Sequence, residues 1–227
     1  MQRMKIITLA LFVCSLLIPG AIDASSASSF ARADFDRSEL GTIETDVFDL
    51  ALGAASCAVK SGAVKDPSTL TVIDYSRPSS EKRLWVFDLK ARELVYEELV
   101  AHGQGSGANM ATQFSNDNES HQTSLGLFVT RDTYVGKNGY SLRLDGLDRG
   151  INDRARERAI VMHGAPYVSD AFVRSNGRLG RSWGCPAVSE LVARKMIDTV
   201  KGGGLVFAYY PDAGWLKTSK YLGGCRA

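Results

Sequence analysis

A cysteine and a histidine are the residues of this chain best suited to covalent catalysis. Cys185 lies in the string RSWGCPAVS between Gly184 and Pro186, and His163 stands 22 residues earlier, after the apolar run AIVM. A thiol needs a base to become a strong nucleophile near neutral pH, and an imidazole is the usual partner. A histidine at a strand end leading into a loop suits this role. Sequence alone leaves three roles open for Cys185: disulfide partner, small buried residue or nucleophile.

The residues beside Cys185 are suited to stabilising a negatively charged oxygen. Gly184 permits a tight turn and a close approach of a substrate carbonyl. The backbone amides of Trp183, Gly184 and Cys185 would then lie where they could converge on a developing oxyanion. A helix predicted to begin near Ser189, with Ser189 as its N-cap, adds a modest positive field. These features favour catalysis without excluding a structural cysteine.

The N-terminal residues have the layout of a secretory signal peptide. A basic start with Arg3 and Lys5 precedes the apolar run 6–17, which is followed by Pro-Gly and small residues. The run is too short to span a bilayer comfortably, although an uncleaved anchor is the alternative. We therefore predict a signal peptide over residues 1–24, a disordered or processed segment over 25–40, and an exported protein.

Cysteine usage sharpens the question about Cys185. The chain has four cysteines, and loss of Cys14 with the signal peptide leaves Cys57, Cys185 and Cys225. An odd number in an oxidising compartment leaves at least one free thiol or an intermolecular pair. A free thiol there is at risk of oxidation unless it is protected or useful.

Composition excludes some classes of partner. The chain has 227 residues, 44% of them hydrophobic, and a formal net charge of +2 with no block of lysines and arginines. We therefore expect no nucleic-acid binding. The absence of GxGxxG and GxxxxGK strings also removes support for nucleotide binding.

Hydrophobic patterns predict a mainly β fold, mixed or antiparallel and sandwich-like, with an N-terminal helix and one late helix. We expect a helical extension over residues 41–66, capped by Thr42 or Thr45, and a catalytic domain over 67–227. Apolar and β-branched patterns place the strands at 70–75, 83–89, 93–103, 125–134, 140–147, 158–164 and 205–211, the late helix at 189–204, and a long polar loop at 103–124.

The string MHGAPYVSDAFVRSNGRLGRSWGCPAV resembles the signature of YkuD-type L,D-transpeptidases, HG followed by [ST]-x-G-C, in the branch with SWGCPA. The resemblance extends over about residues 70–211. The commonest pattern has histidine at the position of Trp183 and arginine at that of Ala187, and these departures bear on how substrate is held. Arg178 and Arg181 are possible substitutes for that arginine, or simply solvated loop charges.

The resemblance implies an exported cysteine acyltransferase acting on peptidoglycan stem peptides. His163 would take the proton of Cys185, whose thiolate attacks the amide between the third residue and D-alanine. The amides near Gly184 would hold the oxyanion. Neither a cofactor nor a metal is expected, and carbapenems would acylate the cysteine. The candidate substrate-contacting residues are Ser182, Trp183, Arg181, His121 and Tyr167.

Three alternatives stay open at this point. Water in place of an acceptor amine would make the protein an L,D-carboxypeptidase, and a non-catalytic wall-binding domain would keep the fold without the reaction. His102 and His121 are each either cleft residues or ordinary turn histidines. We further predict that Cys57 and Cys225, if they pair at all, pair with each other, and that the mature protein resides in the periplasm or cell envelope.

Overall fold

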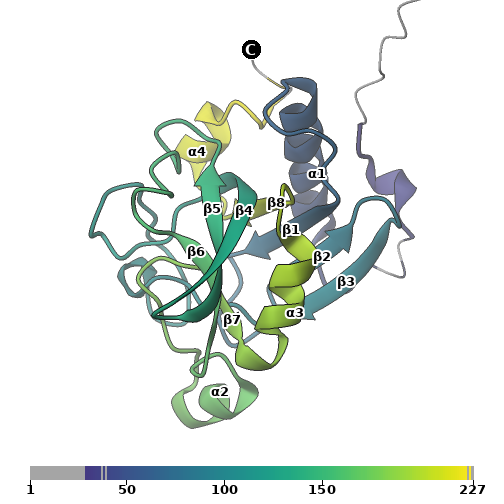
Figure 1. Cartoon of the computed structure of the whole chain (residues 1–227). Coiled ribbons are helices and arrows are strands. Elements are labelled where there is room, and N and C mark those ends of the chain that lie inside the picture. The colour runs from purple at the N-terminus through teal and green to yellow at the C-terminus, as the bar shows by residue number, and fades with distance from the viewer. Residues whose placement is uncertain (1–28, 37, 39, 224, 226–227) are drawn as a thin grey trace, which may run out of the picture.

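A computed structural model describes residues 29–36, 38, 40–223 and 225. The predicted signal peptide, residues 1–24, lies outside them. In chain order the elements are η1 Arg32–Asp34, α1 Thr45–Lys60, β1 Thr69–Asp74, β2 Leu84–Asp88, β3 Glu93–Glu98, η3 Gln104–Ser106, β4 Gly126–Gly136, β5 Gly139–Gly146, β6 Val161–Ala165, α2 Asp170–Asn176, β7 Ala187–Ser189, α3 Glu190–Val200, β8 Leu205–Tyr209 and α4 Ala213–Thr218 (Figure 1).

The strands of the described residues form one mixed sheet of eight, in the order β3-β2-β1-β8-β4-β5-β6-β7. Two neighbouring pairs are parallel, β1 with β8 and β6 with β7, and the other pairs are antiparallel. The mainly β class with an N-terminal and a late helix is therefore confirmed. The parallel pair β6–β7 matters most for the site, because His163 lies on β6 and Cys185 lies two residues before β7 begins.

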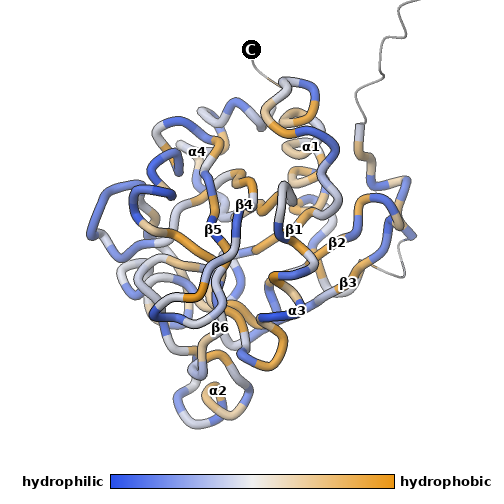
Figure 2. The backbone as a smooth tube through the Cα atoms, in the orientation of Figure 1, coloured by the Kyte–Doolittle hydropathy of each residue, from blue (hydrophilic) through white to orange (hydrophobic). Residues whose placement is uncertain are grey.

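The central strands β1 and β8 are buried; β8 is apolar throughout, whereas β1 also buries Thr69, Thr71 and Asp74. All six residues of β1 and the first four of β8 are buried. Helix α1 packs on these two strands, and its small residues, including Ala51 and Ala55, are fully buried. Figure 2 shows this pattern as hydrophobic colour along the central strands and hydrophilic colour on the outer loops. The sheet thus forms a rigid base for the loops at its edge.

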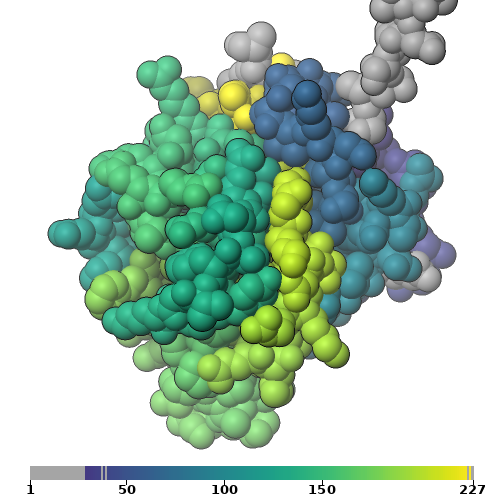
Figure 3. Space-filling view, in the orientation of Figure 1, coloured from purple at the N-terminus to yellow at the C-terminus, as the bar shows by residue number. Residues whose placement is uncertain are grey.

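Helix α3 lies beside the β4–β5 hairpin, as the space-filling view shows (Figure 3). The hydroxyl of Tyr140 in β5 donates a hydrogen bond of 2.7 Å to Asp198 in α3, and the guanidinium of Arg194 lies 4.5 Å from the Tyr140 ring centroid. The hydroxyl of Ser189 accepts from the amide of Leu191 at 3.4 Å, so the predicted N-cap is confirmed. The helix ends at Val200, before three consecutive glycines.

Several element boundaries differ from the predictions. Strand β6 begins at Val161, because residues 158 and 159 belong to a turn, and β3 ends at Glu98. Helix α1 begins after Glu44 without a side-chain cap, so neither threonine caps it. Short α2 was not among the predicted elements. The Ser169 hydroxyl accepts from the Phe172 amide at its start.

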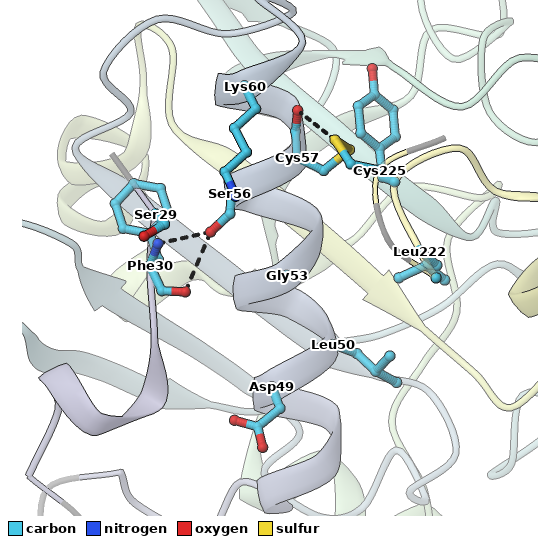
Figure 4. Close-up of a pocket in the computed structure, with 12 residues that line it drawn as sticks. Ser29, Phe30, Asp49, Leu50, Gly53, Ser56, Cys57, Lys60, Leu222 and Cys225 are labelled. Carbon is cyan, nitrogen blue, oxygen red and sulfur yellow. Dashed lines mark hydrogen bonds between the residues drawn. A yellow bond between two sulfur atoms is a disulfide. The ribbon is translucent and has the colours of Figure 1, made fainter. Parts of the chain in front are cut away.

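A disulfide between Cys57 and Cys225 joins α1 to the C-terminal residues, with a sequence separation of 168. The predicted pairing is confirmed, and Cys185 is free. In the close-up, the segment at Phe30 crosses α1 on the helix side that carries Ser56 (Figure 4). The Ser56 hydroxyl accepts from the Phe30 amide at 2.8 Å. None of the helices among the described residues is both long and apolar enough to cross a membrane.

Candidate active site

The Cys185 side chain lies against the start of β6. Its sulfur is 3.4 Å from the amide nitrogen of Val161, which donates to it, and 3.7 Å from the carbonyl oxygen of Ala159. The residue is 8% exposed and belongs to the main apolar core. The thiol therefore lies among apolar core residues and is almost completely shielded from solvent.

The strand pairing of β6 and β7 brings the backbone of His163 close to the segment that follows Cys185. The His163 amide donates to the carbonyl of Pro186 at 3.4 Å, and in the register His163 stands opposite Ala187. Val161 and His163 are two residues apart on one strand, so their side chains share a face of the sheet. The nucleophile and the base predicted from sequence thus occupy adjoining positions on β6 and the segment leading into β7.

The imidazole of His163 is oriented by a backbone carbonyl. Its Nδ1 lies 2.9 Å from the oxygen of Gly164, and a carbonyl oxygen only accepts, so in the neutral ring Nδ1 carries the proton. This leaves the Nε2 lone pair as the base. Burial lowers the pKa of His163 below its ordinary value, with the Gly164 carbonyl opposing the shift. The ring is consequently neutral near pH 7.

Burial raises the pKa of the Cys185 thiol, and two groups counteract this: the Val161 amide and the Arg158 guanidinium. The resting pair is therefore a neutral thiol and a neutral imidazole. Proton transfer to His163 must accompany attack on a substrate, because the free thiolate is disfavoured in this buried position.

The turn before Cys185 is held by its own hydrogen bonds. The Ser182 hydroxyl donates to the Cys185 carbonyl at 2.6 Å and accepts from the Gly184 amide at 3.2 Å. Ser182 is buried, so its side chain serves the turn and is not presented to solvent. Gly184 has a φ of 112°, and a Cβ there would stand 2.7 Å from the carbonyl oxygen of Gln122. Only glycine fits this position.

The buried hydroxyl of Thr123 and the backbone of residues 102–104 hold the turn before Cys185 in place. The Thr123 hydroxyl donates to the Gly184 carbonyl at 3.3 Å and accepts from the Gly103 amide at 2.9 Å. The Ser182 amide donates to the carbonyl of His102 at 3.0 Å. Residues 102–104 and 123 thus fix the backbone that carries the nucleophile.

His102 is fully buried, so it is neither a surface histidine nor a cleft residue. Its Nδ1 lies 2.7 Å from Nη2 of Arg83, which must donate. Burial first, and then the charge of Arg83, lower the pKa of His102 to about 4. Arg83 itself is fully buried and also donates to the carbonyls of Val100 and Arg77. The pair is a structural element of the site's base.

Arg158 joins the outer loop to the nucleophile. It donates four hydrogen bonds to the loop segment 115–124, to the carbonyls of Ser115 and Gln122 and to the hydroxyls of Ser120 and Ser124. Its Nη2 lies 3.5 Å from the point a Cβ on Gly184 would occupy. Sequence reasoning missed this residue.

Trp183 and His121 meet at the mouth of the site. Their rings stack with centroids 4.7 Å apart and an interplanar angle of 15°. They line a hollow of about 560 Å³ together with Asn118, Glu119, Glu157 and Arg158. These two predicted substrate-contacting residues are therefore brought together, and Trp183 lies two residues before Cys185 in the chain.

The other predicted contacts lie differently. Arg181 donates to the carbonyls of Gly107 at 2.9 Å and Gln104 at 3.4 Å, and Arg178 donates to that of Leu179 at 2.7 Å. Both guanidiniums thus have backbone partners. Tyr167 is partly buried and packs on Gly180; burial, and then the Cys185 charge, raise its pKa to about 12.

The surroundings of Ala187 account for the absence of the arginine that the commoner pattern has at this position. It is fully buried in a small apolar cluster with Ala101, Ala165, Val168 and Leu179. An arginine side chain there would have to displace this cluster. Within the described residues, no three His, Cys, Asp or Glu side chains converge as a metal site would require.

Comparisons with known proteins agree with this geometry. The family model described as the L,D-transpeptidase catalytic domain matches residues 39–209. The chain therefore belongs to the L,D-transpeptidase catalytic domain family, as the sequence resemblance predicted. No curated protein sequence matches significantly.

Several solved structures are similar at low identity. An L,D-transpeptidase from Mycobacterium smegmatis has 16% identity and a TM-score of 0.39, covering 63% of this chain and 59% of its own. The helical cell shape determining protein of Campylobacter jejuni has 13% identity and a TM-score of 0.45, covering 70% and 55%. L,D-transpeptidase 3 from Mycobacterium tuberculosis, solved with a faropenem-derived adduct, has 13% identity and a TM-score of 0.42, covering 64% and 61%. This chain spans less than two thirds of these structures.

Proposed function

We propose that the protein is an exported L,D-transpeptidase that acts on peptidoglycan stem peptides through a thioester on Cys185. The observation that carries the proposal is that the Cys185 sulfur accepts from the Val161 amide at the start of β6, the same strand that carries His163, whose Nδ1 is engaged by the Gly164 carbonyl. Family membership supports the same chemistry.

The first half-reaction forms the acyl-enzyme. Nε2 of His163 takes the thiol proton as the sulfur attacks the carbonyl carbon of the third stem residue. The tetrahedral oxyanion is stabilised by backbone amides of the turn, and His163 returns the proton to the departing D-alanine amine. The Gly184 amide already donates to Ser182. The Cys185 amide is therefore the better placed donor of the two.

The second half-reaction transfers the acyl group to an amine. The acceptor loses a proton to His163, attacks the thioester carbonyl and releases the Cys185 sulfur, which regains its proton. Water in place of the amine gives the L,D-carboxypeptidase reaction. The two outcomes share every step up to the thioester.

Incubation of the mature protein with disaccharide-tetrapeptide, followed by mass analysis, tests the proposal. Cross-linked dimer with release of D-alanine supports transpeptidation, and tripeptide alone would make the protein a carboxypeptidase. Cys185→Ala should abolish both products while the circular dichroism spectrum stays that of the folded protein. Unchanged substrate with folded wild-type protein would contradict both activities.

Export is a separate part of the proposal and rests on the N-terminal sequence. Expression of the full chain in a bacterial host should give a mature N-terminus near Ala24 in the periplasmic or secreted fraction. Full-length protein confined to the cytoplasmic fraction would contradict it. The same preparation also reports the state of the cysteines, because a reducing and a non-reducing peptide map should differ only in the Cys57–Cys225 peptides.

A further inference from the structure

Trp183 is the exposed tryptophan of the three in the chain. Its residue is 66% exposed, whereas Trp85 is 0% and Trp215 is 2% exposed. Its side chain is not needed to build the turn, because Ser182 and Gly184 hold the turn through their own hydrogen bonds. Tryptophan is enriched at binding interfaces, where its large ring packs against a partner and its indole N–H can donate a hydrogen bond.

The ring is held rigidly from two sides. The Gln104 amide donates to the carbonyl of Ser182 at 2.8 Å, which fixes the backbone before the ring. The stacked partner His121 has a φ of 53°, and its Nδ1 lies 3.0 Å from Nε2 of Gln104. A preformed platform binds without paying the full entropy of ordering a mobile side chain.

The rest of the hollow is polar and contains planar hydrogen-bonding groups. We call the space lined by Asn118, Glu119, His121, Glu157, Arg158 and Trp183 the aromatic hollow. The Glu157 carboxylate accepts from Asn118 and pairs with Arg154 at 3.0 Å. These groups are already oriented by one another. An aromatic face with a rim of carboxylate, amide and guanidinium groups matches a pyranose ring, which has an apolar C–H face and a rim of hydroxyls.

We propose that the aromatic hollow binds a sugar ring of the peptidoglycan glycan strand, stacked on Trp183, while the attached stem peptide reaches Cys185. The inference rests on the proposed function and adds the part of the substrate that the enzyme recognises. Trp183 precedes Cys185 by two residues, so a sugar on Trp183 would lie on the same side of the turn as a stem peptide that reaches Cys185. An extended peptide would instead call for main-chain groups along an open strand edge, whereas the lining here is made of side chains.

The tip of the β4–β5 hairpin adds a charge to the same place. Lys137 lies beyond the end of β4, and its ammonium nitrogen is 5.8 Å from the Trp183 ring centroid. The residue is exposed. Its three donors are therefore available to hydroxyl or N-acetyl oxygens of a sugar that occupies the platform.

Tryptophan fluorescence tests the binding without requiring turnover. The probe is a peptide-free oligomer of N-acetylglucosamine, titrated into the wild-type protein. A saturable change in emission is expected, because Trp85 and Trp215 are buried and Trp183 is the exposed reporter. His121→Ala keeps the reporter and should weaken binding about tenfold, the effect of losing one stacking and positioning contact. Leu191→Ala, which removes a 93% exposed side chain on α3, should leave the titration unchanged.

Kinetics on two substrates give the second test. Wild-type protein should prefer disaccharide-tetrapeptide over sugar-free tetrapeptide in kcat/KM, and Trp183→Ala should reduce that preference about tenfold. Trp183→Phe should restore part of it, and Leu191→Ala should keep it.

The outcomes separate the inference from the proposed function. No saturable emission change together with equal kcat/KM for the two substrates would overturn the sugar site and leave the transpeptidase reaction standing. Saturable binding of the free tetrapeptide at this tryptophan, with none of the glycan, would overturn it in favour of a peptide contact. Glycan binding without turnover of either substrate supports the sugar site and counts against the proposed reaction.

Discussion

Removing the charge of Arg158 should make the Cys185 thiol a poorer nucleophile. Arg158 lies beside Gly184, the residue before the nucleophile, and is partly buried. The Arg158 guanidinium lowers the pKa of the Cys185 thiol, and a stabilisation of the thiolate by about 1.4 kcal/mol is the order of magnitude for two charges at such a partly solvated site. That energy corresponds to about tenfold less thiolate at a fixed pH below the thiol pKa.

The expected change in rate is smaller than the change in thiolate. A thiolate of higher pKa is intrinsically more nucleophilic, with a Brønsted coefficient of about 0.45, so about a third of the wild-type rate should remain. The assay is alkylation of Cys185 by iodoacetamide, followed by intact mass over a range of pH. In Arg158→Met the rate at pH 7 should fall about threefold, and the midpoint of the profile should move to higher pH.

Two further variants separate charge from scaffolding. Arg158→Lys keeps the charge but cannot make all four hydrogen bonds to segment 115–124, so it should alkylate at nearly the wild-type rate while losing thermal stability. Arg154→Met is the matched control, because Arg154 lies one turn earlier and pairs with Glu157 instead of facing the thiol. An unshifted profile in folded Arg158→Met would refute the electrostatic argument.

Three other predictions follow from the geometry. Replacing Cys57 and Cys225 by serine opens a loop of 168 residues, and the chain-entropy argument gives a loss of up to about 5 kcal/mol in the free energy of unfolding, measurable by urea titration. Gly184→Ala puts a Cβ against the Gln122 carbonyl and should lower kcat about 100-fold with the fold retained; near-wild-type turnover would contradict this. Because the pKa of His102 is about 4 when folded and about 6.5 when unfolded, the unfolded chain binds the proton first. Stability should therefore fall as the pH drops from about 6.5 towards 4, less steeply in His102→Gln.

The sequence was sufficient for the parts of the site that are local in the chain. The HG and SWGC strings contain the predicted base and nucleophile, and the glycine before the cysteine predicts a turn that other residues cannot form. The helix cap at Ser189 and the pairing of Cys57 with Cys225 were also predicted correctly. At each of these positions, the residue type is compatible with few other structural roles.

The parts built from distant segments could not be predicted. Arg154, Arg156 and Arg158 alternate in one short stretch and look equivalent in sequence. In the fold, the first two form ion pairs on the surface, and the third turns inward to segment 115–124. The sequence around His102 likewise does not predict its burial, because its partner Arg83 is distant in the chain and lies just before β2.

The placement of the three cysteines in the described residues also bears on oxidative folding. Three thiols allow three single disulfides, and two of those would consume the nucleophile. In the native protein the Cys185 sulfur is buried in the core and its raised pKa keeps it protonated, so it is a poor attacking group for thiol–disulfide exchange. Burial of Cys185 against the sheet therefore favours the Cys57–Cys225 disulfide over the two pairings that would involve Cys185. If β6 and β7 form before oxidation, Cys185 is already buried and only the Cys57–Cys225 disulfide remains accessible. We therefore expect a disulfide isomerase to be needed mainly when folding is slow.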